Sequence, residues 1–134
     1  MKKVKVFIER GDDGYSAYME ANAMDYLCVG DGKTVDEAVK DFYDAYNEVK
    51  DYYSKNGKSF EEAEFEFCYD SVSFLQLITN VFTLSGLSKI TGINKKQLGH
   101  YVQGVSKPRP ATAQKIKQGV LKYAKDLTSV NFIN

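Results

Sequence analysis

Residues 91–104 read Thr-Gly-Ile-Asn-Lys-Lys-Gln-Leu-Gly-His-Tyr-Val-Gln-Gly, and this stretch predicts a tight turn followed by a short helix. Gly92 can adopt a positive φ where the chain reverses direction, at no steric cost. Asn94 is a favourable N-cap residue, because its side-chain oxygen can accept a hydrogen bond from the first turn of a helix. Residues 95–103 are then long enough for about two and a half helical turns.

The predicted helix has one apolar and one polar face. Its apolar side chains recur at spacings typical of a face that packs against a core, and they are Leu98, Tyr101 and Val102. The opposite face carries Lys95, Lys96, Gln97 and His100. A short helix of this kind can lie in the major groove of DNA, where its polar side chains reach base edges and phosphates. The alternative is a plain helical hairpin with a basic, solvated face.

The flanking segments extend this pattern into an all-α unit. Thr83 can cap a helix over residues 84–90, before the turn. After the turn and second helix, Lys107 and Arg109 lie in a stiff basic loop that contains proline. Pro110 favours the start of a further helix. That helix is longer than a minimal four-helix domain needs, so we expect part of it to form a homodimer contact.

The same residues resemble the lambda-repressor-like (Xre) helix-turn-helix family, through residues 87–94 and 104–108. Two positions depart from the family pattern. Ser88 replaces the usual alanine, and Leu84 stands where the family often has a DNA-contacting glutamine. The resemblance implies a DNA-binding and dimerisation domain over residues 71–134. The expected DNA contacts, in the groove or on the backbone, are Lys95, Lys96, Gln97, His100, Lys107 and Arg109.

The net charge of zero conceals two oppositely charged halves. Residues 1–70 contain 9 Lys and Arg against 17 Asp and Glu, a net charge of −8. Residues 71–134 contain 9 Lys and Arg and one acid, a net charge of +8. This asymmetry indicates two modules with different partners: polyanions for the basic half and a basic protein for the acidic half. Alternatively, the two halves attract each other within a monomer.

The N-terminal half predicts the order β-β-β-α-β. The strands are expected at residues 4–10, 15–20, 26–29 and 64–69. The helix is expected to begin at a capping box in residues 34–37 and to end at Asn56-Gly57. Residues 11–14 and 30–33, both rich in glycine and aspartate, are predicted turns. Ser71 is then expected to cap a helix over residues 72–82.

This order resembles the HicB antitoxin family of bacterial toxin–antitoxin systems. The similarity lies in residues 8–15, in Tyr18 and in residues 30–38. It implies that residues 1–70 form a partial RNase H-like module that binds a toxin and precedes a DNA-binding domain. The whole chain is then an α+β protein. Its expected toxin contacts are Asp12, Asp13, Tyr15 and Tyr18.

Composition and residue patterns argue against a membrane protein, a secreted protein, a metal-binding protein and a nuclease. A hydrophobic content of 43% is typical of a globular chain, and no apolar stretch is long enough to span a membrane. The start of the chain has no signal-peptide pattern, so we expect a cytoplasmic protein. Cys28, Cys68 and His100 give no zinc-binding pattern, and no cofactor or metal is expected. A nuclease is not expected either, because residues 6–8, at the centre of the first strand, include no carboxylate.

These observations predict an antitoxin of a type II toxin–antitoxin system. We expect it to neutralise a HicA-like mRNA-cleaving toxin by occlusion and to repress its own operon by binding operator DNA as a dimer. The alternative is a stand-alone helix-turn-helix repressor whose N-terminal module senses a small ligand.

Overall fold

The structure is a computed structural model that describes residues 1–133. Over these residues it contains a four-stranded sheet and five helices, so the expectation of an α+β fold is confirmed. The chain forms two compact units, Met1–Leu77 and Ile78–Asn134. The expected boundary after residue 70 marks the start of a helix that lies almost wholly in the first unit.

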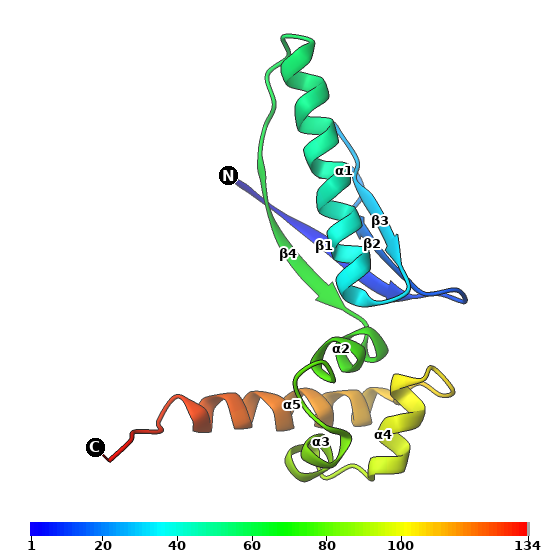
Figure 1. The fold of residues 1–134 in the computed structure, drawn as a ribbon, viewed down its shortest axis with the longest axis vertical. Coiled ribbons are helices and arrows are strands. Elements are labelled where there is room, and N and C mark those ends of the chain that lie inside the picture. The colour runs from blue at the N-terminus through cyan, green and yellow to red at the C-terminus, as the bar shows by residue number, and fades with distance from the viewer. Residues whose placement is uncertain (134) are drawn as a thin grey trace. The chain divides into compact units, whose positions relative to one another are not determined.

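The elements of the two units are labelled in Figure 1. The first unit contains β1 (Lys2–Arg10), β2 (Tyr15–Met19), β3 (Val29–Gly32), α1 (Val35–Lys55), β4 (Ala63–Tyr69) and α2 (Ser71–Ile78). The second unit contains α3 (Leu84–Thr91), α4 (Lys95–Val102) and α5 (Pro110–Leu127). Over residues 1–133, each helix is too short or too polar to cross a lipid bilayer.

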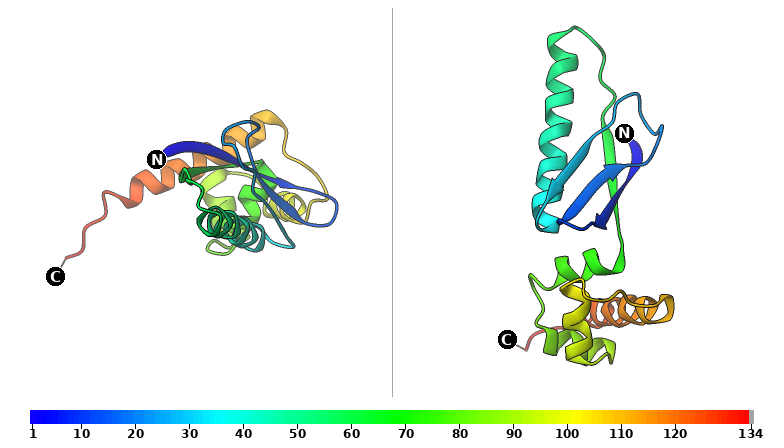
Figure 2. Two further views of the ribbon diagram at one scale, coloured as in Figure 1. Left: turned by 90° about the horizontal axis from the view of Figure 1, so that it is seen from above. Right: turned by 90° about the vertical axis from the view of Figure 1, so that its right-hand side faces the viewer.

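The sheet of the first unit has the strand order β3-β2-β1-β4. β1 pairs antiparallel with β2 and parallel with β4, and α1 belongs to the crossover connection that a parallel pair requires. α1 covers one face of the sheet (Figure 2), and alternate strand residues are buried beneath it. The resulting core includes Val4, Val6, Ile8, Tyr15, Ala17, Met19, Val35, Ala38, Phe42 and Tyr46.

The two ends of α1 confirm the sequence prediction. At its start, the backbone N–H of Glu37 donates to Thr34 Oγ1 at 3.1 Å. The Glu37 carboxylate accepts in turn from the backbone N–H of Lys33 at 2.9 Å, one residue before the position that a standard capping box uses. At its end, Asn56 is the C-cap, and Gly57 follows with a φ of 64°.

The third strand differs from the prediction. We expected a strand at residues 26–29 and a turn at 30–33, but β3 spans Val29–Gly32. Gly30 faces α1, and a Cβ at this position would overlap the backbone nitrogen of Phe42 and lie 2.5 Å from the carbonyl oxygen of Ala38. The glycine therefore permits α1 to pack directly on the strand, and the sequence pattern gave the appearance of a turn.

The helix after β4 also differs from the prediction. It spans Ser71–Ile78 and not residues 72–82, and Asp70 rather than Ser71 supplies the capping side chain. The Asp70 carboxylate accepts from the backbone N–H of Ser73 at 2.7 Å and from that of Arg10 at 3.0 Å. One side chain thus joins the ends of β1 and β4 to the start of α2.

In the second unit, α3 packs against both α4 and α5. The buried apolar side chains come from all three helices and from the turn, and they are Leu87, Ile93, Leu98, Tyr101 and Ile116. Thr83 caps α3 as predicted, by accepting from the backbone N–H of Gly86 at 3.0 Å. The C-terminal half of α5 runs past α3 and α4 (Figure 1). There, Leu121 is 57% exposed and Leu127 is 51% exposed.

Candidate nucleic-acid and partner interfaces

The turn between α3 and α4 is held by local hydrogen bonds. Gly92 has a φ of 74°, and its backbone N–H donates to the carbonyl oxygen of Ser88 at 2.8 Å. The Ser88 hydroxyl donates to the carbonyl oxygen of Ile93 at 2.6 Å, which an alanine here would not do. The Asn94 side chain accepts from the backbone N–H of Lys96 at 2.8 Å and so caps α4. These bonds fix the direction in which α4 leaves the turn.

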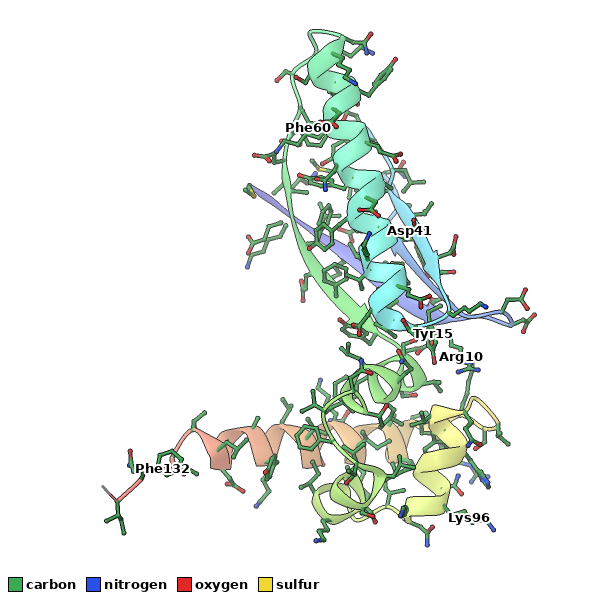
Figure 3. All side chains as sticks on the ribbon, in the orientation of Figure 1. Arg10, Tyr15, Asp41, Phe60, Lys96 and Phe132 are labelled. Atoms are coloured by element: carbon green, nitrogen blue, oxygen red, sulfur yellow. The ribbon has the colours of Figure 1, made fainter. Side chains whose placement is uncertain are left out.

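α4 has a buried apolar back and an exposed polar front. Leu98 and Tyr101 are buried, and Val102 is partly buried. Of the expected DNA contacts, Lys95, Lys96 and Gln97 are exposed and His100 is partly exposed. The Lys96 side chain extends from α4 toward solvent (Figure 3).

Within residues 1–133, Lys95 and Lys96 on the front of α4 form no ion pair with a carboxylate. Asp126 is the one acidic residue between residues 71 and 134. Its carboxylate lies 3.3 Å from Lys122 Nζ, on α5. Lys95 and Lys96 therefore project positive charge that the unit itself does not neutralise, and such a surface attracts a polyanion.

The remaining two expected DNA contacts, Lys107 and Arg109, lie in the exposed loop between α4 and α5. This loop follows the C-terminal end of α4, whereas Lys95 and Lys96 are the first two residues of α4. The eight residues of α4 correspond to a helix length of about 12 Å. Cations at both ends of the helix can thus reach different phosphates of one duplex.

A shallow depression of about 520 Å³ lies between the start of α3 and the front of α4. Its lining combines cations, amides and two apolar groups, and consists of Leu84, Asn94, Lys95, Lys96, Gly99, His100 and Gln103. Three of the expected groove contacts, Lys95, Lys96 and His100, therefore border a recess, whereas Gln97 is not part of its lining.

The four expected toxin contacts do not form one patch. Asp12 and Asp13 are exposed at the tip of the β1–β2 hairpin. Tyr18 lies on the sheet face opposite α1, where its hydroxyl donates to the Glu9 carboxylate at 2.7 Å. This hydrogen bond, more than burial, raises the pKa of Tyr18.

The expectation fails for Tyr15, which is 4% exposed. Its ring lies beneath α1 because alternate residues of β2 face the core. Arg10 Nη1 donates to the Tyr15 hydroxyl at 2.9 Å, and the guanidinium lies 5.4 Å from the ring centroid. Tyr15 therefore mainly stabilises the unit, and the small part of it that is accessible borders a depression of about 540 Å³ that Asp12 and Asp13 also line.

The outward face of α1 carries a row of carboxylates that we did not single out from the sequence. The row comprises Glu37, Asp41, Asp44, Glu48 and Asp51, here called the acidic stripe. All five are exposed, at spacings of four, three, four and three residues. At 1.5 Å per residue the stripe is about 21 Å long, with about 5 Å between neighbours.

The acidic stripe is only partly compensated within the first unit. Asp41 accepts from the backbone N–H of Asp31 at 2.9 Å, and Asp44 lies 3.0 Å from Lys40 Nζ. Glu48 and Asp51 have no ion-pair partner among residues 1–133. Like charges three or four residues apart destabilise a helix by about 0.2–0.5 kcal/mol per pair. The stripe thus costs the unit stability that a cationic partner can restore.

The carboxylates do not assemble into a metal site in the described part of the chain. No group of three or more His, Cys, Asp or Glu side chains within residues 1–133 is arranged to hold a metal ion. Asp70, at the end of β4, is already engaged by the backbone of Ser73 and Arg10.

Comparisons of the chain with protein-family models, with curated proteins and with solved structures gave no match. A fold by itself does not determine a function. The function proposed below therefore depends on the side chains that the two units expose.

Proposed function

We propose that this chain is an antitoxin that also represses transcription. The unit Ile78–Asn134 binds duplex DNA through the front of α4. The unit Met1–Leu77 binds a small basic, HicA-like RNase and blocks its RNA-binding face. The observation that carries the proposal is the α4 helix itself: its apolar back is buried, and its front holds Lys95 and Lys96, which form no ion pair in the described residues 1–133.

For DNA, α4 has suitable dimensions and chemistry. A major groove about 12 Å wide admits an α-helix. In that position, Gln97 can form a bidentate pair with an adenine, and Lys95 and Lys96 can reach guanine edges or phosphates. Lys107 and Arg109 neutralise backbone phosphates, which adds affinity without sequence preference. This assignment makes α3 and α4 a helix-turn-helix of the lambda-repressor-like kind.

A single α4 helix contacts only one half-site, so the proposal includes a homodimer. Two-fold operators match two-fold proteins, with half-sites about one helical turn of DNA apart. The exposed Leu121 and Leu127 on α5 provide an apolar contact for a second copy. Phe132, which follows α5, is a further exposed apolar side chain, at 85%.

For the toxin, the acidic stripe supplies the recognition chemistry. A row of carboxylates spaced by about 5 Å presents a basic protein with a line of negative charge, as a nucleic-acid backbone does. Tyr43 and Tyr52 are exposed on the same helix, and tyrosine is enriched at protein interfaces. The mixed sheet with one crossover helix supports the partial RNase H-like, HicB-like assignment of this unit.

One observation favours a second candidate, a repressor that senses a small ligand. The sheet face opposite α1 borders a depression of about 590 Å³, within the usual size range of small-molecule sites. Its apolar lining includes Phe7, Tyr18, Met24, Leu27 and Val29. A ligand that raises the melting temperature of the full chain and changes its DNA affinity, with no capture of a basic RNase, would favour this candidate.

The antitoxin proposal predicts that neutralising part of the stripe weakens toxin binding. Glu48→Gln combined with Asp51→Asn should reduce affinity for a catalytically inactive HicA-type RNase by about 10- to 100-fold, or about 1.4–2.8 kcal/mol. The free energy of unfolding should not fall, because like-charge repulsion is removed. Calorimetric titration and urea denaturation measure the two effects.

The matched control is Glu64→Gln combined with Glu66→Gln on β4, which removes the same charge from exposed acids outside α1. It should weaken binding less than threefold. An equal loss in both double variants would show that toxin binding depends on net charge and not on the stripe.

A further inference from the structure

Gly99 lies in the middle of α4, and the fold does not explain its presence there. Its φ is not in the left-handed range, and a Cβ would meet only Leu84 Cδ1, at an ordinary contact distance of 3.5 Å. Glycine weakens a helix interior relative to alanine. Gly119 in α5 is different, because a Cβ there would overlap the carbonyl oxygen of Ile90. Packing thus requires Gly119 but not Gly99.

Because Gly99 has no side chain, it leaves space in the depression at the front of α4. Gly99 and Leu84 are the two apolar groups in the depression at the front of α4. Around them are the polar residues Asn94, Lys95, Lys96, His100 and Gln103. The result is a small apolar notch, formed by Leu84 and Gly99, inside the surface assigned to DNA.

We propose that this notch receives the C5-methyl group of a thymine, so that Leu84 and Gly99 determine part of the sequence specificity. The thymine methyl is the apolar group that a base pair presents in the major groove. A leucine beside a helix backbone without a side chain can bury this methyl group. The surrounding lysines and amides, by contrast, favour the hydrogen-bonding edges of bases. The inference rests on the proposed binding of α4 in the major groove. 5-Methylcytosine carries the same methyl group, and unmethylated synthetic DNA excludes it from the test.

The test uses the full chain and synthetic duplexes. Sequences are first selected from a random duplex library, and each thymine of the selected site is then replaced singly by deoxyuridine, which lacks only the methyl group. Fluorescence anisotropy should show a loss of about fourfold in affinity at one thymine per half-site, the value for burying one methyl-sized group. Replacement of the other thymines should change affinity less than 1.5-fold.

Two variants assign the effect to the notch. Leu84→Ala should reduce the thymine preference at that position to less than 1.5-fold, whereas Ser85→Ala, at the neighbouring exposed residue, should retain it. Gly99→Ala fills the notch and should remove the preference while raising the melting temperature by about 2–6 °C, because alanine favours the helix. The Gly99 variant keeps the test decisive if Leu84→Ala does not fold.

The outcomes separate the inference from the proposed function. Tight binding to a selected site that is insensitive to deoxyuridine at every thymine would overturn the notch and leave DNA binding intact. Retention of the fourfold preference in both Leu84→Ala and Gly99→Ala would overturn it as well. Failure to bind any duplex in the library would contradict the proposed function itself.

Discussion

Gly30→Ala is expected to destabilise the first unit by about 3 kcal/mol, a large fraction of the stability typical of a small folded unit. A Cβ at residue 30 would overlap the backbone nitrogen of Phe42 and lie 2.5 Å from the carbonyl oxygen of Ala38. Backbone atoms in the middle of a 21-residue helix cannot move aside individually, so α1 would have to separate from β3. Urea denaturation followed by circular dichroism measures the loss.

Gly11→Ala is the matched control for this prediction. The nearest atom to a Cβ at residue 11 is the carbonyl oxygen of Gly14 at 3.9 Å, and the φ of Gly11 is not positive. The control should change the free energy of unfolding by less than about 0.5 kcal/mol. If the two variants unfold at the same urea concentration, α1 does not pack directly against the backbone of Gly30 in β3.

Gly30→Ala is expected to affect the acidic stripe as well as the stability of the first unit. The hydrogen bond from the backbone N–H of Asp31 to the Asp41 carboxylate joins β3 to the acidic stripe at 2.9 Å. Separation of α1 from β3 would break this hydrogen bond. The carboxylates of the stripe would then no longer be held in a fixed position relative to the sheet. Gly30→Ala should therefore also abolish RNase capture, even though residue 30 carries no side chain that a partner could contact.

The second large effect is expected in DNA binding. Lys95→Ala combined with Lys96→Ala should weaken binding to a selected duplex by about 2–4 kcal/mol, roughly 30- to 900-fold. Both lysines are exposed, and neither forms an ion pair within residues 1–133, so their charge is available to the DNA. Fluorescence anisotropy measures the affinity, and the melting temperature should remain within about 2 °C of the original.

Lys117→Ala combined with Lys125→Ala provides the control, because it removes the same charge from exposed residues of α5. A general electrostatic attraction would make the two double variants equally weak. Direct contact by α4 predicts a loss at least tenfold greater for the α4 pair than for the α5 pair.

Local signals in the sequence predicted the elements that the structure confirms. Thr34 with Glu37, Thr83 and Asn94 each accept or exchange the capping hydrogen bonds expected of them. Gly92 has the positive φ that the turn requires. These features depend on residues within four positions of one another, which is why the sequence alone identifies them.

Features that depend on distant residues were predicted poorly. β3 was placed three residues too early because Gly30 and Gly32 resemble a turn until α1 is known to lie against them. Asp70 was not identified as the cap of α2 because the neighbouring Ser71 is also a favourable N-cap residue, and the second bond of Asp70, from the N–H of Arg10, has no local signal. The parallel pairing of β1 with β4 likewise has no local signature.

The candidate sites also differ in how well local sequence patterns predict them. The exposed front of α4 followed from helical periodicity and is observed. Tyr15 was misplaced because periodicity in β2 separates two faces without showing which one α1 covers. The acidic stripe was readable from its four–three spacing, but we assigned no role to the outward face of that helix from the sequence.

The most direct test of the account is the salt dependence of duplex binding by the full chain and by the Lys95→Ala, Lys96→Ala variant. Each phosphate contact contributes about −0.9 to the slope of log K against log salt concentration. We predict a steep negative slope for the original chain and a slope about 2 smaller in magnitude for the variant, because two cations no longer displace counterions. Absence of binding to any duplex at low salt, or identical slopes for the two proteins, would contradict the assignment of α4 to DNA.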